Sequence, residues 1–392
     1  MEKRERPTET AWSKLPCRKR RKQLDEDDDE EIPYIPQDII FDVFLRCPPD
    51  FLYDSARFVC KTWYNLIRNP RFTRDHLLRH VHPPDHAVGL LFVKNPRARI
   101  SRFLEISEGN IKLTDFIHQF PAQILPTSYG VALYYRIENI AESLYVVNPV
   151  TKQVVKLPRP DFKRLRFYFR WSCISYLPGT EEIKVVTRVK DMGEQYHWYI
   201  LTVGRKMSWR KIVSTVNPEG ITIRGFVSDG MPTCVGGVVY WKFEGKIVAI
   251  DLSDEIIHYF YLPMTLKSQG RLLEMGNHLC MIEITRTSVL RPENVWIMEG
   301  LKQKEWAIIY KLEVNFELKN AGILFPRPIG WLENQQMLLF EEYVRGTPSS
   351  EVVPVIVAYD VRTGTRTSYM RRSLYLSLDD IVVVHSSSLI SW

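Results

Sequence analysis

The side chains of this sequence that could do chemistry include a cluster of four histidines, His76, His80, His82 and His86. His76 and His80 are four residues apart, so they could share one face of a helix. No cysteine accompanies them to complete a tetrahedral metal site, and Pro83 and Pro84 would break the helix before His86. We therefore expect an exposed helix end here rather than a metal site.

Other catalytic and metal-binding patterns are absent from the sequence. The six cysteines, at positions 17, 47, 60, 173, 234 and 280, form no Cys-x-x-Cys pair, so neither a disulfide framework nor a zinc site is predicted. A reducing compartment is the simplest interpretation of this cysteine usage. There is no phosphate-binding glycine loop, no nucleophile elbow and no His-Glu-x-x-His. We predict no cofactor, although a site assembled from distant loops stays open.

A basic and aromatic run extends from Lys163 to Trp171. Strand alternation places Arg164, Arg166 and Arg170 on one face and apolar side chains on the other. Such a face could bind an acidic or phosphorylated partner or a nucleic-acid backbone. An ordinary solvated outer face is the simpler interpretation, because exposed polar faces are normal in antiparallel sheets. The three arginines are therefore only candidates for target binding.

A helical segment from Ile35 to Leu78 precedes this run. Ile39, Ile40, Val43 and Phe44 recur at helical spacing, and Pro48-Pro49 should end that first helix. A second helix is predicted to begin near Asp54 as its N-cap. Four apolar residues of that helix should share one face: Val59, Trp63, Leu66 and Ile67. About 45 residues are too few to bury much of this apolar surface. The alternative interpretation is an ordinary three-helix cap on a larger domain.

The same segment resembles the F-box. The resemblance rests on Ile35-Pro36, on Asp38-Ile39-Ile40, on Arg57-Phe58-Val59-Cys60-Lys61-Thr62-Trp63 and on Leu66-Ile67. Isoleucine stands where the family has leucine before Pro36, and Cys47-Pro48-Pro49-Asp50 departs from the usual turn. The resemblance implies docking onto a Skp-type adaptor of a cullin ubiquitin ligase. The residues that it assigns to adaptor binding are Ile35, Pro36, Ile39, Ile40, Val43, Phe44, Val59, Cys60, Lys61 and Trp63.

From residue 87 to 392 the sequence is typical of an all-β domain, with short β-branched and aromatic runs between turn signals. Possible turn markers at Asn95, Asn148, Val203, Asp251, Met298 and Asp360 recur at intervals close to the ~50 residues of a kelch-type blade. We therefore predict a β-propeller of about six blades, with an irregular β-sandwich as the alternative. The segment Ile381–Val384 should be a strand that helps to close the ring. Asn148-Pro149 and Tyr359-Asp360 with their neighbours also resemble the F-box-associated, kelch-like domain of plant F-box proteins.

Residues 1–31 are mostly charged and have few apolar side chains, so we expect a disordered tail. The basic run Arg18–Lys22 could direct the protein to the nucleus, or it could simply be a solvated charge block beside the acidic run at 25–31. Nucleus and cytoplasm are thus both expected locations. Neither a secretory signal nor a membrane span is predicted from the apolar runs.

Together these patterns predict a non-catalytic receptor with three parts: a tail at 1–31, an F-box-like helical module at 32–80 and a β-domain at 87–392. Its expected partners are a Skp-type adaptor, a cullin scaffold bound through it, and an unknown target protein, with no membrane partner. Two alternatives stay open. One is a propeller enzyme with a helical cap, and the other is a nucleic-acid-binding module that uses the strand at 163–171.

Overall fold

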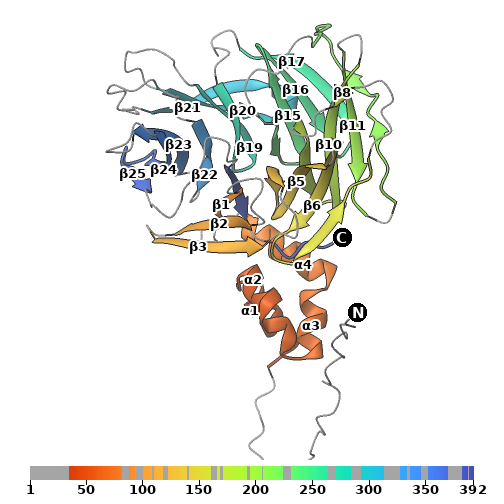
Figure 1. Cartoon of the computed structure of the whole chain (residues 1–392), viewed down its shortest axis with the longest axis vertical. Coiled ribbons are helices and arrows are strands. Elements are labelled where there is room, and N and C mark those ends of the chain that lie inside the picture. Colours follow the sequence, from red (N-terminus) through yellow and green to blue (C-terminus); the bar gives the residue numbers. More distant parts are fainter. Residues whose placement is uncertain are drawn as a thin grey trace, which may run out of the picture. The chain divides into compact units, whose positions relative to one another are not determined.

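The structure is a computed structural model (Figure 1). It describes residues 35–81, 88–93, 100–107, 110–117, 122–138, 141–159, 166–167, 171–191, 195–204, 206–223, 231–263, 270–283, 293–312, 327–332, 336–345, 352–369, 382–386 and 388–392. The chain divides into two compact units, Met1–Ile40 and Phe41–Trp392. The predicted tail and its basic run lie outside the described residues. No helix among the described residues is both long enough and apolar enough to cross a membrane.

Short helices form the first part of the described chain. They are α1 (Gln37–Phe44), α2 (Pro49–Asp54), the 3-10 turn η1 (Ala56–Phe58), α3 (Lys61–Ile67) and α4 (Pro70–Val81). Proline sets two of the starts: Pro49 and Pro70 are each the first residue of a helix, where the missing N–H would have no partner. As predicted, α1 ends before Pro48-Pro49.

The helices from Phe41 onward share a small aromatic core. Phe44 is buried and packs edge-on against Trp63, with ring centroids 4.8 Å apart. Phe72 is fully buried against Phe41, with centroids 5.3 Å apart. His76 is also buried, and its Nε2 lies 2.9 Å from the carbonyl oxygen of Cys47. That hydrogen bond ties α4 to the turn between α1 and α2.

Two predictions about these helices are wrong. Asp54 was expected to begin a helix, but it is the last residue of α2. Val59 was expected on the buried face with Trp63, but it follows η1, precedes α3 and is 64% exposed. The reason is that Cys60, between the two positions, has extended backbone as the N-cap of α3, so no continuous helix joins Val59 to Trp63 and the i, i+4 spacing does not put them on one face.

Beyond residue 87, the strands of the described chain form six sheets, which we number as blades in chain order. Blade 1 holds β26 (Val382–Ser386), β1 (Val88–Val93), β2 (Ile100–Ser107) and β3 (Asn110–Ile117), and blade 2 holds β4 (Gln123–Ser128), β5 (Val131–Glu138), β6 (Ala141–Asn148) and β7 (Gln153–Lys156). Blade 3 holds β8 (Arg166–Phe167), β9 (Cys173–Leu177), β10 (Glu182–Lys190), β11 (Tyr196–Thr202) and β12 (Arg210–Lys211). Blade 4 holds β13 (Thr215–Val216), β14 (Thr233–Val235), β15 (Val238–Phe243), β16 (Lys246–Asp251) and β17 (Ile256–Tyr261).

The last two blades have four strands each. Blade 5 holds β18 (Gly270–Met275), β19 (His278–Glu283), β20 (Glu293–Glu299) and β21 (Glu305–Leu312), with the short helix α5 (Gly300–Gln303) before its last strand. Blade 6 holds β22 (Arg327–Leu332), β23 (Met337–Arg345), β24 (Val352–Asp360) and β25 (Arg366–Tyr369). Neighbouring strands are antiparallel, except that β13 runs parallel to β17.

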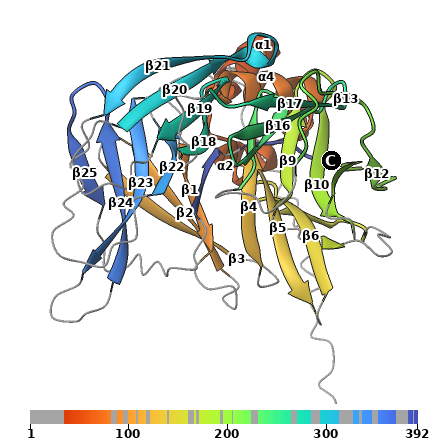
Figure 2. The ribbon, with the colours of Figure 1, turned by 90° about the horizontal axis from the view of Figure 1, so that it is seen from above.

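The sheets form a closed ring, as a propeller requires. Each innermost strand contacts the innermost strand of the next blade, in the order β4, β9, β14, β18, β22, β26 and back to β4 (Figure 2). Blade 1 joins both ends of the domain, because β26 pairs with β1 from Val88 opposite Ser386 to Phe92 opposite Val382. The propeller prediction and the predicted use of the C-terminal strand are confirmed, and the sandwich alternative is excluded.

The apolar core lies between blades rather than inside one sheet. Buried residues of blades 3 and 4 form one cluster, which includes Val186 and Trp198 from one sheet and Trp241 and Phe243 from the other. Similar clusters join blades 2 and 3, blades 4 and 5, and blades 5 and 6. Each blade therefore shares buried apolar surface with its neighbours, and a break in the ring should weaken the whole domain.

Three of the predicted turn markers close the third strand of a blade. Asn148, Asp251 and Asp360 each accept backbone N–H bonds from the residues two and three positions later, and the shortest bonds in the three turns are 2.9, 2.8 and 2.8 Å. This side chain-to-backbone turn explains why Asn or Asp recurs there. The marker Asn95 lies outside the described residues. In the chain it lies between β1 and β2, which are the second and third strands of blade 1, whereas the three markers above close the third strand of their blades.

Candidate functional site

The helical region exposes large apolar side chains. Ile35, Ile39 and Val43 are each more than half exposed, and the last two are four residues apart in α1, so they share one helix face. Phe58 and Val59, at the end of η1, are 68% and 64% exposed. Exposed apolar side chains in sequence-adjacent pairs and on one helix face are typical of surfaces that bind another protein.

The residues predicted to bind an adaptor divide by burial. Pro36, Cys60 and Lys61 are exposed, while Ile40 and Trp63 are partly buried. Phe44 is 4% exposed, so its main role in the free protein is to pack against Trp63. It follows that the exposed members can bind a partner directly, whereas Phe44 and Trp63 support the helices that present them.

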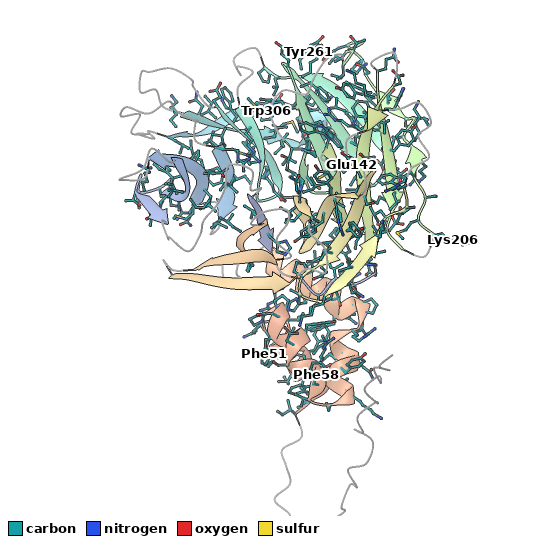
Figure 3. All side chains as sticks on the ribbon, viewed as in Figure 1. Phe51, Phe58, Glu142, Lys206, Tyr261 and Trp306 are labelled. Atoms are coloured by element: carbon teal, nitrogen blue, oxygen red, sulfur yellow. The ribbon has the colours of Figure 1, made fainter. Side chains whose placement is uncertain are left out.

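Sequence reasoning missed three exposed rings, those of Phe51, Phe58 and Tyr64. Figure 3 marks Phe51 and Phe58 on the helices. The sequence feature that could have predicted them is the number of aromatic residues in this helical segment, which is too small to bury all of their rings.

Arg57 fixes the position of one of these rings. Its guanidinium carbon lies 3.4 Å from the centre of the Tyr53 ring and 4.5 Å from that of Phe58. The Tyr53 hydroxyl donates a 2.7 Å hydrogen bond to the carbonyl oxygen of Thr151, within the unit that starts at Phe41. Asp54 accepts a 2.7 Å bond from Lys152 in the same turn. Through these contacts, the end of α2 is held against the β6–β7 turn.

The other candidate site residues give no comparable arrangement. Arg164 and Arg170 lie outside the described residues, and only the backbone of Arg166 is described, opposite Lys190 of β10. His82 and His86 also lie outside the described residues. Among the residues that the structure does describe, no group of three His, Cys, Asp or Glu could hold a metal ion.

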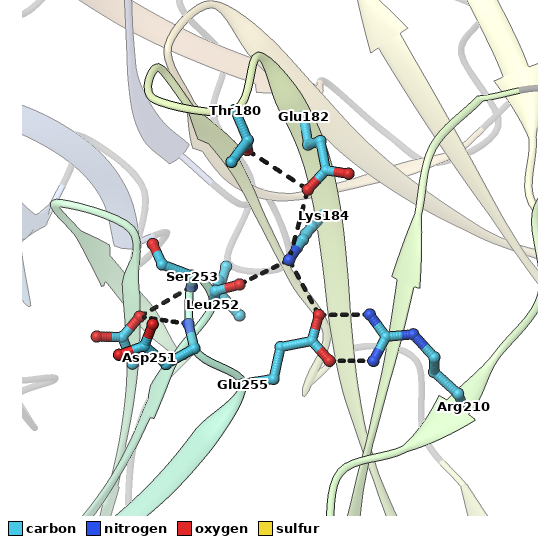
Figure 4. A network of polar contacts seen from close by, with 9 residues as sticks. Thr180, Glu182, Lys184, Arg210, Asp251, Leu252, Ser253 and Glu255 are labelled. Carbon is cyan, nitrogen blue, oxygen red and sulfur yellow. Dashed lines mark hydrogen bonds and ion pairs between the residues drawn. The ribbon is translucent and has the colours of Figure 1, made fainter.

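The charged network of blades 3 and 4 is a structural site (Figure 4). Lys184 is almost fully buried, and its Nζ donates to the carbonyl oxygen of Leu252 at 2.8 Å and to Glu255 at 3.0 Å. Arg210 donates two hydrogen bonds to the same carboxylate. These bonds from Arg210, and then the bond from Lys184, hold the pKa of Glu255 at about 2. Glu255 therefore stays ionised and joins the two blades.

The comparisons with known proteins agree with this architecture. The F-box domain model matches residues 32–75, and the F-box associated beta propeller domain model matches residues 90–323. The chain is 23% identical to F-box/kelch-repeat protein At4g19930 of Arabidopsis thaliana over 87% of this chain and 84% of that one. It is 27% identical to F-box protein CPR1 of Arabidopsis thaliana over 78% of this chain and 79% of that one.

A third curated relative is F-box protein DOR of Arabidopsis thaliana, 23% identical over 71% of this chain and 74% of that one. Among solved structures, TolB from Acinetobacter baumannii matches with a TM-score of 0.44 and 13% identity, over 76% of this chain and 69% of that one. That structural likeness is too distant to indicate a function.

Proposed function

The chain belongs to the family defined by the F-box associated beta propeller domain and has an F-box ahead of that domain; on that premise we propose that it is the substrate receptor of an SCF-type cullin ubiquitin ligase. In this role the helices bind a Skp-type adaptor, and the adaptor joins the receptor to the cullin. The propeller binds a target protein and holds it close to the ubiquitin donor, so that transfer becomes effectively intramolecular. The receptor itself supplies no catalytic group.

The observation that carries this proposal is the exposed apolar surface of the F-box. Ile39 and Val43 form one exposed helix face, and Phe58 and Val59 form an exposed pair. Full burial of such a side chain is worth about 1.5–3 kcal/mol, and these four are between about half and two-thirds exposed, so a partner that covers them would gain roughly that fraction of it for each. An adaptor with a complementary apolar surface would bury them on binding.

The direct test is binding of the purified full-length chain to a purified Skp-type adaptor, measured by calorimetry. We expect a stoichiometric complex with a negative heat-capacity change, because apolar surface is buried. The complex should then recruit a cullin scaffold in a gel-filtration assay. An adaptor that does not bind at micromolar concentration would contradict the proposal and favour a propeller enzyme with a helical cap.

Identification of the target requires a second experiment in cells. Affinity capture with and without a proteasome inhibitor should recover the adaptor and the cullin under both conditions. The target should accumulate only with the inhibitor. Capture of the chain without adaptor or cullin would argue against the ligase role.

A further inference from the structure

Arg188, in β10, is a buried cation enclosed by aromatic rings. The residue is only 6% exposed. Its guanidinium carbon lies 4.7 Å from the ring centre of Trp171, 4.9 Å from that of Tyr196 and 5.7 Å from that of Phe243. We call these three rings the aromatic cage. Trp171 and Tyr196 belong to blade 3 and Phe243 belongs to blade 4, so the cage lies where two blades meet.

The cage is held in place by buried groups. The Trp241 side chain is 1% exposed, and its Nε1 donates a 3.2 Å hydrogen bond to the carbonyl oxygen of Trp171. Phe243 is 3% exposed, whereas Trp171 and Tyr196 are only partly buried. The inner wall of the cage is therefore fixed, and its outer wall is formed by two rings at the surface.

The guanidinium has a charge but no counterion in the described part of the chain. Its Nη1 is shielded from solvent and has no hydrogen-bond partner. The neighbouring carboxylate of Asp191 is engaged by His197, whose Nε2 lies 2.9 Å from it. Burial lowers the pKa of Arg188 to about 10, so the group is still charged at neutral pH. A buried charge without a carboxylate is unfavourable unless a ligand supplies one.

The surroundings of the cage also favour an anion. Lys190, two residues along the same strand face, places its Nζ 5.8 Å from the Tyr196 ring centre. In the sheet register, Lys190 stands opposite Arg166, which belongs to the basic run noted in the sequence. Lys190 therefore adds a second cation beside the cage.

The cage lies at the rim of the propeller that is opposite the helix contacts. Tyr53 and Arg74 reach Thr151 and Glu181, which lie in the β6–β7 and β9–β10 turns. Arg188 is near the other end of β10, beside the connection to β11. Successive hairpins of an antiparallel sheet lie at opposite ends of the strands. A ligand at the cage would thus leave the helix-contacting turns uncovered.

We propose that Arg188 anchors a target-recognition site for an extended peptide segment that carries one oxyanion, either a phosphorylated or an acidic side chain. For this to happen, the partly buried outer rings must move aside, because Nη1 is shielded from solvent. The guanidinium would then pair with the oxyanion by two parallel hydrogen bonds, and the outer rings would pack against the neighbouring peptide residue. The peptide belongs to a ubiquitination target only if the proposed ligase function is correct. Binding of the peptide itself is independent of the adaptor.

The test uses the full-length chain and arrayed peptides with phosphoserine, phosphothreonine or glutamate at the centre, beside the same peptides with serine, threonine or glutamine. We expect preferential capture of the anionic peptides and, for the tightest one, a loss of affinity of about tenfold or more in Arg188→Met. Arg188→Lys should bind with intermediate affinity, because an ammonium keeps the charge but loses the planar fork. The matched control is Lys206→Met, which removes an exposed cation from blade 3 (Figure 3) and should bind as the wild type does.

The melting temperature separates recognition from a purely structural role. Methionine removes the charge and keeps a flexible apolar chain, so Arg188→Met should melt at or above the wild-type temperature if the cation serves a ligand. If Arg188→Met does not fold, Arg188→Lys carries the binding comparison. The proposal is overturned if no anionic peptide is preferred, if Arg188→Met binds as tightly as the wild type, or if random single-stranded RNA binds at this site instead of peptides. Adaptor binding, measured in parallel, reports on the ligase function separately.

Discussion

The Asn148 side chain binds the C-terminal tail directly, because its amide nitrogen donates a 2.7 Å hydrogen bond to the carbonyl oxygen of Ile390. The same nitrogen donates to the carbonyl oxygen of Ser388 at 3.1 Å. Its Oδ1 meanwhile accepts the turn bonds from Val150 and Thr151. One buried amide therefore shapes the β6–β7 turn and fastens the last residues of the chain to blade 2.

This double role predicts a large effect for Asn148→Asp. The carboxylate keeps an acceptor for the turn, but it cannot donate to the two carbonyl oxygens and places a charge at a fully buried position. We expect the free energy of unfolding to fall by at least about 2 kcal/mol, measured by urea denaturation. The matched control is Asp360→Asn, which keeps the turn acceptor at the equivalent position of blade 6 and should change stability by about 1 kcal/mol or less. Equal effects in the two variants would contradict the role of the amide.

Truncation after Asp380 should strongly destabilise the propeller. It removes β26, which is the innermost strand of blade 1, together with the buried residues Leu389 and Ile390. We expect the thermal unfolding of the β-domain to shift down by more than 10 °C, since several kcal/mol of contacts are lost and about 1 kcal/mol shifts the melting temperature of a large domain by about 2–4 °C. An unchanged melting temperature would show that the ring does not depend on this strand.

A point substitution tests the tail without truncation. Gly130 has φ +78°, and a Cβ atom there would lie 2.4 Å from Oγ of Ser388 and 2.6 Å from its backbone nitrogen. Gly130→Ala should therefore displace the tail and destabilise the domain by about 1–3 kcal/mol. The matched control is Gly220→Ala, where φ is also positive but no atom lies within 4 Å of the added Cβ. If both variants lose the same stability, only backbone strain is at work and the tail contact is unimportant.

The parts of this fold that could be predicted depend on short-range patterns. The Asn and Asp turn markers are local hydrogen-bonding devices, so their spacing predicted blades. The donor role of Asn148 could not be predicted, because its partners Ser388 and Ile390 are at the other end of the chain. The sequence does hold one hint: asparagine stands where two other blades have aspartate.

The candidate sites likewise include features that short-range patterns predict and features that depend on tertiary packing. The exposed Ile39 and Val43 follow from helical spacing in a short segment, whereas the position of Val59 was predicted wrongly because extended backbone at Cys60 separates it from the helix that holds Trp63. The cage around Arg188 combines rings from two sheets, and only the tertiary packing of blades 3 and 4 brings them together. The sequence around Arg188 contains no pattern that predicts the aromatic cage.

The F-box should show two separable phenotypes. Ile35→Ala with Pro36→Ala removes exposed side chains, so we expect lost adaptor binding and nearly unchanged thermal unfolding. Trp63→Ala removes the ring that packs on Phe44 and should cost about 3–5 kcal/mol, so binding is lost because the helices unfold. Adaptor pulldown and helical circular dichroism, measured on the same samples, distinguish the two causes. A double variant that binds fully would show that other exposed residues, such as Phe58, dominate the interface.

The network around Glu255 predicts a specific acid sensitivity. The hydrogen bonds from Arg210, and then the contacts with Lys184, lower the pKa of Glu255 from 4.5 to about 2. The folded state therefore favours the carboxylate, so its stabilising contribution is complete above about pH 4.5 and is lost as the pH falls towards 2. Glu255→Gln should lose about 1–3 kcal/mol at neutral pH, because two cations lose a charged partner. Chemical denaturation between pH 7 and pH 2.5 should show this difference from the wild type shrinking as the pH falls. The control is Glu244→Gln, which replaces an exposed carboxylate of blade 4 and should leave the dependence of stability on pH unchanged. A difference in stability between Glu255→Gln and the wild type that stays constant at all pH values would show that the charge of Glu255 contributes nothing.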